Sequence, residues 1–153
     1  MAEYANNSPQ SVAVSQPVLL NTVIGCNKGY VLHREGSGIL TLRGATNGPC
    51  NNFARYQVLF KANIGIPSTE TAPASISTAI TLNGEVLPIS KGIVTAAAVV
   101  PATPVDTDEN YNVVVNPATI TVPSCCCINI SVENTSNIPI TVKNANLVVT
   151  RIA

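Results

Sequence analysis

Apolar and polar residues alternate along most of this chain, and runs rich in Val, Ile and Thr lie between clusters of Gly, Pro and Asn. Alternation with a period of two places successive side chains on opposite faces of a β-strand, whereas a helix repeats about every 3.6 residues. Hardly any stretch shows the helical period. The pattern therefore predicts an all-β protein built from short strands.

The predicted strands follow one another at intervals of about eight to twelve residues, a spacing typical of β-sandwiches and jelly rolls. The pair Asn83-Gly84 predicts a two-residue type I′ hairpin turn, because both residues tolerate positive φ angles. With no helix between strands, we expect a single antiparallel jelly-roll or β-sandwich domain. Strands are predicted at residues 12–20, 30–34, 38–43, 55–64, 75–82, 85–90, 93–99, 111–116, 126–133 and 138–152.

The chain has 153 residues, a usual size for one domain, and none of its predicted loops is long enough to be a domain linker. We divide it into residues 1–17, an N-terminal arm or first strand, and residues 18–153, the jelly-roll domain. The first segment carries Pro9 and Pro17. Two interpretations stay open: a strand of its own domain, or an arm that adds to the sheet edge of a neighbouring subunit.

Charged residues make up 10% of the chain, and the two signs balance at eight each. Ordinary soluble domains carry roughly 25%, and a surface with few charges and no net charge permits association. We therefore expect a homo-oligomer, the alternative being a monomer solvated by Asn, Thr and Ser. The scattered basic residues form no patch for nucleic acid, and no apolar run approaches the roughly 20 residues of a membrane span.

The residues needed for catalysis are scarce, because His33 is the only histidine of the chain. We expect it to be a hydrogen-bonded structural residue. The segment Gly36-Ser37-Gly38 lacks the Gly-x-Ser-x-Gly spacing of a nucleophile elbow, and no phosphate-binding loop is present. Asp106, Asp108 and Glu109 lack the EF-hand pattern and suggest a solvated loop. The sequence predicts a protein that is not an enzyme and has no cofactor or metal.

The cysteines leave two interpretations open: reduced, buried thiols, or disulfides that staple an assembled shell. In a strand, Cys125 and Cys127 would face one way and Cys126 the other, so that one is buried while another meets a partner. Cys26 and Cys50 could bridge each other or reach this triplet, and the odd count leaves at least one thiol free or available between subunits. The Cys-x-x-Cys spacing typical of zinc sites is absent.

Residues 140–153 resemble the last strand of small bacterial and phage-encoded domains of the tumour-necrosis-factor/C1q-like jelly-roll type. Residues 33–44, and residues 79–88 taken with residues 131–135, are similar to the same group. Domains of this type form compact homotrimers, and their relatives occur on virion surfaces, in phage fibres and on spore-surface filaments. The resemblance implies a trimer with a display or decoration role.

These observations predict a structural, self-assembling protein of a phage virion, of the capsid-decoration or head-fibre type. No signal peptide is visible, so we expect it to reach the virion or extracellular surface without one. The alternatives are a spore-surface or extracellular appendage subunit stapled by disulfides, and a carbohydrate- or receptor-binding module. Alternation suggests subunit contacts at Tyr111, Val113, Val115, Leu147 and Val149.

Overall fold

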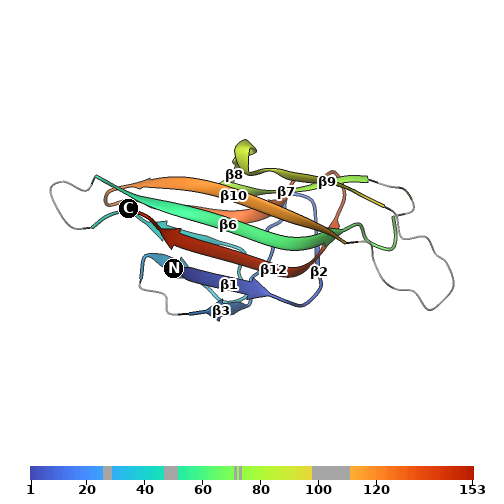
Figure 1. Cartoon of the computed structure of the whole chain (residues 1–153), viewed down its shortest axis with the longest axis horizontal. Coiled ribbons are helices and arrows are strands. Elements are labelled where there is room, and N and C mark those ends of the chain that lie inside the picture. The colour runs from blue at the N-terminus through green and yellow to red at the C-terminus, as the bar shows by residue number, and fades with distance from the viewer. Residues whose placement is uncertain (26–28, 47–51, 71, 73, 98–110) are drawn as a thin grey trace.

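A computed structural model describes residues 1–25, 29–46, 52–70, 72, 74–97 and 111–153 of the chain. Two antiparallel sheets form a sandwich whose longest strands run along the long axis of the molecule (Figure 1). Within these residues there is no α-helix, and the one helical element is a single 3-10 turn, η1 (Pro88–Ser90). The predicted all-β sandwich is confirmed.

The first sheet ends at a long edge strand. Its strands are, in spatial order, β10 (Asn112–Pro123), β6 (Phe53–Gly65), β12 (Ile140–Arg151), β1 (Ala2–Asn6) and β3 (Thr22–Ile24). A short strand, β2 (Gln10–Val12), pairs with the start of β12. Because β10 pairs only with β6 in this sheet, one side of a twelve-residue strand faces outward along the flank of the sandwich.

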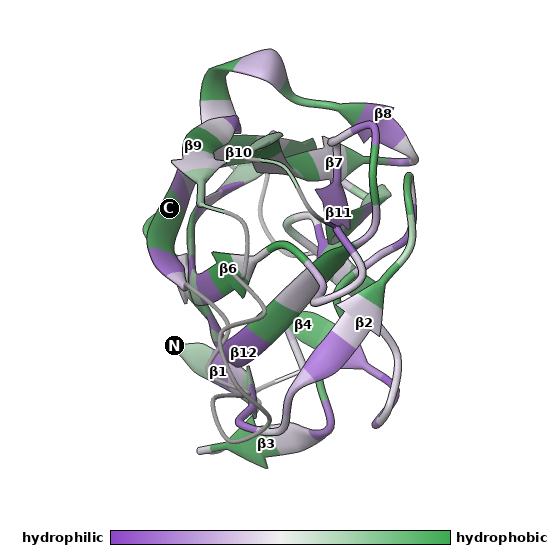
Figure 2. Ribbon diagram, turned by 90° about the vertical axis from the view of Figure 1, so that its right-hand side faces the viewer, coloured by the Kyte–Doolittle hydropathy of each residue, from purple (hydrophilic) through white to green (hydrophobic). Residues whose placement is uncertain are grey.

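The second sheet lies opposite the first. It contains, in spatial order, β4 (Val31–His33), β5 (Leu40–Arg43), β11 (Cys127–Asn134), β7 (Ala74–Leu82) and β8 (Glu85–Val86), and β9 (Gly92–Ala96) pairs with the first half of β7. The turn between β7 and β8 has φ angles of 50° at Asn83 and 87° at Gly84, which confirms the predicted type I′ hairpin. Beyond it, η1 protrudes next to β8 and β9 (Figure 2).

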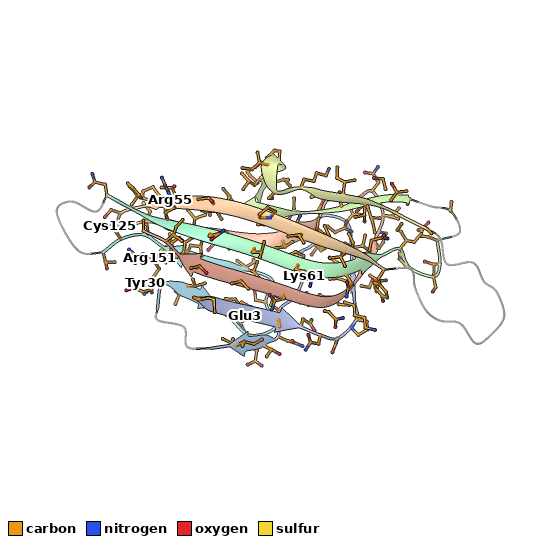
Figure 3. All side chains as sticks on the ribbon, viewed as in Figure 1. Glu3, Tyr30, Arg55, Lys61, Cys125 and Arg151 are labelled. Carbon is orange, nitrogen blue, oxygen red and sulfur yellow. The ribbon has the colours of Figure 1, made fainter. Side chains whose placement is uncertain are left out.

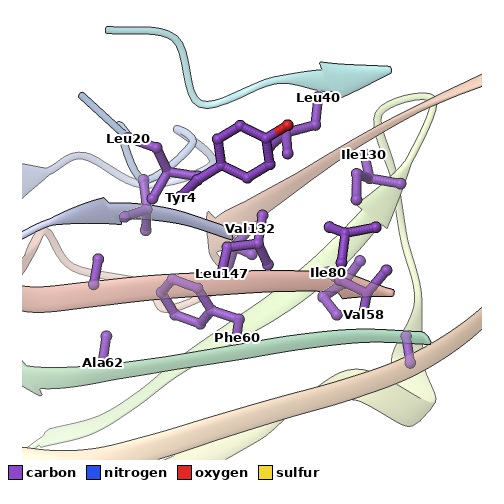
Figure 4. Close-up of a cluster of buried hydrophobic side chains, with 14 of the residues drawn as sticks. Tyr4, Leu20, Leu40, Val58, Phe60, Ala62, Ile80, Ile130, Val132 and Leu147 are labelled. Atoms are coloured by element: carbon purple, nitrogen blue, oxygen red, sulfur yellow. The ribbon is translucent and has the colours of Figure 1, made fainter. Parts of the chain in front are cut away.

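The core fills the space between the two sheets with aliphatic side chains around three aromatic ones. Tyr4, Tyr56 and Phe60 are fully buried, and Figure 4 shows Phe60 and Tyr4 among Leu, Ile and Val side chains that come from both sheets. Fully burying one such side chain contributes about 1.5–3 kcal/mol to folding. The inward positions of β6 are every second residue from Ala54 to Ile64, which follows the predicted alternation.

Two differences from the predicted strands have local causes. No strand spans residues 12–20, because β2 stops at Val12 and Ser15 turns the chain with a φ of 59°. Conversely, β10 continues to Pro123, well beyond the predicted end at residue 116, and passes through Pro117. A proline lacks the N–H needed inside a sheet, but it is tolerated on an edge strand such as β10.

The N-terminal segment is held in the sheets of its own chain. β1 lies between β12 and β3, and Tyr4 packs its ring 4.7 Å from that of His33, centroid to centroid. Farther along, the buried side chain of Asn134 donates hydrogen bonds to the carbonyls of Val12, at 3.0 Å, and Ile138, at 2.9 Å. The structure thus gives residues 2–6 and 10–12 strand positions, and exchange of an arm between subunits stays a prediction.

Candidate assembly surface

The outer face of the first sheet carries an apolar group of side chains near the edge strand. Pro117 of β10, Leu59 of β6 and Val148 of β12 lie directly opposite one another in the ladder, so their side chains point to the same side of the sheet. Val113 and Val115 extend this group along β10, and they are 58% and 47% exposed. The outer face of β10 is thus apolar toward its N-terminal end.

The edge of the second sheet adds to this flank. β9 lies against β10, and its Ile93 is 61% exposed. Ile89, in the protruding turn η1, is 80% exposed. We call Ile89, Ile93, Val113 and Val115 the apolar flank. Exposed single hydrophobic residues are ordinary, but a group of large ones on two neighbouring edge strands and the adjacent turn is typical of an interaction site.

The structure corrects two of the five predicted contact residues. Leu147 and Val149 are each only 1% exposed and lie in the core, so the prediction that they contact another subunit is wrong. The cause is a bulge between Lys143 and Asn146, where Asn144 has a φ of 53°. Such an extra residue exchanges the two faces of a strand, so the buried side changes parity at this point.

Val113 and Val115 do lie on the surface, where a contact residue must lie, and their role in a contact stays a prediction. Tyr111, the remaining candidate, precedes β10 and is partly buried. The Lys143 ammonium lies 5.8 Å from the centre of its ring, within the range of a cation–π interaction. Tyr111 therefore joins the start of β10 to the bulge region of β12.

A buried polar network fixes the position of the edge strand. Asn116 of β10 is completely buried, and its amide donates to the carbonyls of Thr78, at 2.8 Å, and Ser90, at 2.6 Å. Its side-chain oxygen accepts from the Thr78 hydroxyl at 2.8 Å. These bonds join the two sheets and η1 directly beneath the apolar flank. Alternation did not single out Asn116, because a buried amide looks the same as a solvated one in sequence.

The cysteine triplet lies on a turn at one end of the sandwich. Cys125 and Cys126 follow the end of β10, and Cys127 begins β11. All three are exposed and none is in a disulfide, so the prediction that one of them is buried in a strand is wrong. The turn, where Cys125 has a φ of 59°, removes the alternation expected of a continuous strand. Cys26 and Cys50 lie outside the described residues.

The other sequence-derived candidates are structural or untested. The Nε2–H of His33 donates to the Ser37 carbonyl at 2.9 Å, so the ring is hydrogen-bonded as predicted. Among the residues that the structure describes, no group of three or more His, Cys, Asp or Glu is placed to hold a metal ion. Asp106, Asp108 and Glu109 fall outside them. In the same described ranges, no helix is both long and apolar enough to cross a membrane.

The cysteine end also holds a hollow of about 450 Å³, whose lining includes Tyr30, Tyr56 and Arg151. The Tyr56 hydroxyl donates to the carbonyls of Tyr30 and Arg43. The guanidinium of Arg151 lies 4.5 Å from the centre of the Tyr30 ring. These contacts join β6 and β12 to Arg43 of β5 and to Tyr30, the residue before β4.

We expect Tyr56→Phe to lower the free energy of unfolding by about 1 kcal/mol, because one buried hydrogen-bonded hydroxyl is lost. Burial raises the pKa of Tyr56, an effect that nearby Arg151 partly offsets. The folded state thus favours the neutral hydroxyl of Tyr56. The contribution of this hydroxyl to the free energy of unfolding is complete below about pH 10 and is lost as the pH rises through the pKa of the folded state. The free energy of unfolding, measured by denaturation from pH 9 to pH 11, should fall less in the variant than in the unaltered protein. An equal fall in both proteins would contradict the raised pKa of Tyr56.

No protein-family model matches this chain, and no curated protein matches it either. A solved structure of the globular domain of zebrafish complement 1qA protein is similar over 99% of this chain and 96% of that one, with a TM-score of 0.55 and 11% identity. The fold is a C1q-type jelly roll. This confirms the predicted jelly roll and the resemblance to C1q-like domains, and at this identity the likeness shows the fold alone.

A solved structure of a carbohydrate-binding module of type CBM35, from Cellvibrio japonicus Abf62, also aligns with this chain. It is 11% identical, and the alignment covers 94% of this chain and 97% of that one. Its TM-score is 0.29, which is too low to carry an argument about fold or ligand.

Proposed function

We propose that this protein is a structural, non-enzymatic module that assembles with copies of itself through the apolar flank. The observation that carries the proposal is the exposure of Ile89 on η1 together with Ile93, Val113 and Val115 on the adjoining edge strands β9 and β10. The sequence offers few charges to keep such a surface in water, since only 10% of its residues are charged. Burial of this flank against another copy would remove the apolar area from water.

Side-chain packing suits this edge better than strand addition. A long exposed edge strand can pair with another chain through its free backbone groups. In β10, however, Pro117 interrupts the row of N–H donors near the middle of the strand. A contact through the side chains of Val113 and Val115 needs no such donors. We therefore propose that the flank packs on a different surface of the next copy.

A contact between two different surfaces closes into a ring when the rotation between copies allows it. Leu59 and Val148 share the outer face of the first sheet with Val113 and Val115, whereas Ile89 and Ile93 lie on η1 and β9 at the edge of the second sheet. We propose a homotrimer, the assembly implied by the resemblance to C1q-like and tumour-necrosis-factor-like domains. On this view the flank of one copy meets the outer face of the first sheet of the next.

We further propose that the assembled protein is a component of a phage virion, as a capsid decoration or head fibre. The small number of charged residues and the lateral assembly proposed above support a role as a component of a particle. The alternative is a spore-surface or extracellular appendage subunit, which would use the exposed thiols as staples. Genes for capsid and portal proteins beside its own would favour the virion, and sporulation genes would favour the spore.

The double variant Val113→Asp/Val115→Asp tests the assembly contact. Two carboxylates without partners in an apolar interface cost several kcal/mol, so we expect the dissociation constant to rise at least about 100-fold. Sedimentation velocity should show monomer where the unaltered protein is a trimer. Val86→Asp is the matched control, because Val86 is 42% exposed on β8 of the second sheet and lies outside the proposed contact. An unchanged mass for the double variant would contradict the proposal.

A further inference from the structure

Three consecutive thiols are presented at one end of the sandwich. Cys125, Cys126 and Cys127 connect β10 to β11, and each is exposed. Figure 3 places Cys125 at the same end as Arg55, Arg151 and Tyr30. We call residues 124–127 the thiol turn. Free cysteine is among the most often buried residue types, so three exposed thiols in succession need a reason other than packing.

The thiol turn is anchored to the strands beside it. The Gly44 N–H donates to the Cys126 carbonyl at 2.8 Å, and the Cys125 N–H donates to the Ala45 carbonyl at 3.3 Å. Ser124 donates twice, from its N–H to the Asn52 carbonyl at 2.8 Å and from its hydroxyl to the Ala45 carbonyl at 3.0 Å. The three thiols are therefore displayed in a fixed position and not on a loose tail.

The thiols have no suitable partner within the turn. Adjacent Cα atoms lie about 3.8 Å apart, whereas disulfides usually span about 4.4–6.8 Å between Cα atoms. Neighbouring cysteines are thus poorly placed to pair. A bond between Cys125 and Cys127 would still leave Cys126 free. The three sulfurs also do not form one of the groupings that could hold a metal ion among the described residues.

The thiol turn is far from the apolar flank. Val113 lies ten residues before Pro123 along β10, which corresponds to about 33 Å of extended strand. A copy that uses its flank for a lateral contact therefore keeps the thiol turn accessible at its end. The two surfaces can act at the same time.

We propose that the thiol turn forms disulfides with the thiol turn of a second copy and so joins one assembled unit to the next. This inference rests on the proposed function only in that it adds a covalent link to an assembled particle. A thiolate of one turn attacks a low-molecular-weight disulfide, which releases one small thiol and leaves a mixed disulfide. A thiolate of the second copy then attacks the protein sulfur and releases the other small thiol. Two protein thiols are oxidised and one small disulfide is reduced to two thiols.

The test uses the full chain, oxidised glutathione and electrophoresis without reductant. We expect covalent dimers and larger species from the unaltered protein. The variant Cys125→Ser/Cys126→Ser/Cys127→Ser should form at least tenfold less of them. The matched control, Cys26→Ser/Cys50→Ser, should form as much as the unaltered protein. Serine is nearly the same size as cysteine, and circular dichroism would verify that both variants are folded.

Peptide mapping decides which sulfurs are joined. A peptide containing residues 125–127 linked to a second copy of itself can come only from two chains, and this is the expected product. Linkage of that peptide to Cys26 or Cys50 of the same chain, or to glutathione alone, would overturn the proposal, as would cross-links that persist in the triple variant. The mass of the triple variant under reductant tests the trimer separately, so the two proposals can fail independently.

Discussion

Asn116→Ala is expected to lower the free energy of unfolding by about 2–4 kcal/mol. The change removes the partner of three polar groups: the Thr78 hydroxyl, the Thr78 carbonyl and the Ser90 carbonyl. Leaving a buried polar group without a partner costs about 1–3 kcal/mol. Urea denaturation should show a lower midpoint with an unchanged slope.

The matched control is Asn137→Ala, because Asn137 is exposed in the loop between β11 and β12. A surface substitution of this kind changes stability by no more than about 0.5 kcal/mol. A loss below that value for Asn116→Ala would show that the buried network does not hold the edge strand. The same variant should also weaken self-assembly, since Asn116 lies on β10 between the exposed Val115 and Pro117 and supports the strand that carries the apolar flank.

Gly44→Ala is the second substitution with a large expected effect. A Cβ at this position would overlap the carbonyl oxygen of Pro123 and crowd that of Cys126, and both are backbone atoms of the segment that carries the thiols. Overpacking of this kind costs about 1–3 kcal/mol. We expect a lower urea midpoint and altered exposure of Cys125 to a thiol reagent, because relief of the overlap requires the thiol turn to move.

Gly36→Ala separates steric overlap from backbone strain. Gly36 has a φ of 77°, and a Cβ there would meet no atom within 4 Å. Its substitution should therefore cost about 1 kcal/mol through the left-handed conformation alone and leave the thiol turn unchanged. Equal thiol reactivity in Gly44→Ala and the unaltered protein would contradict the close approach of Gly44, the residue after β5, to the turn.

The fold class could be predicted from the sequence because it depends on a repeated signal. Alternation continues over the thirteen residues of β6, and Asn83-Gly84 has one favoured turn geometry. The strand ends were harder to predict. Pro117 suggested the end of a strand, whereas an edge position let β10 continue to Pro123. No strand was predicted at β3, and residues 1–17, which hold β1 and β2, were left open between an arm and a first strand because this stretch is polar and contains prolines.

The candidate site was predicted only in part, and the reason is the bulge at Asn144. Alternation places Leu147 and Val149 on one face of their strand, but it cannot show which face is the core, and the bulge exchanges the two faces within the strand. Val113 and Val115 carry the same pattern and lie on the surface. Asn144 offered a local signal, since Asn adopts positive φ more readily than most residues. The thiol turn was misplaced because a strand was assumed to begin before Cys127.

Self-assembly is tested most directly by the solution mass of the purified protein, measured by light scattering in reductant and after addition of a low-molecular-weight disulfide. We expect a discrete trimer in reductant and larger species, joined by disulfides, when the low-molecular-weight disulfide is present. A strict monomer at tens of micromolar in both conditions would contradict self-assembly and leave the apolar flank to a different partner.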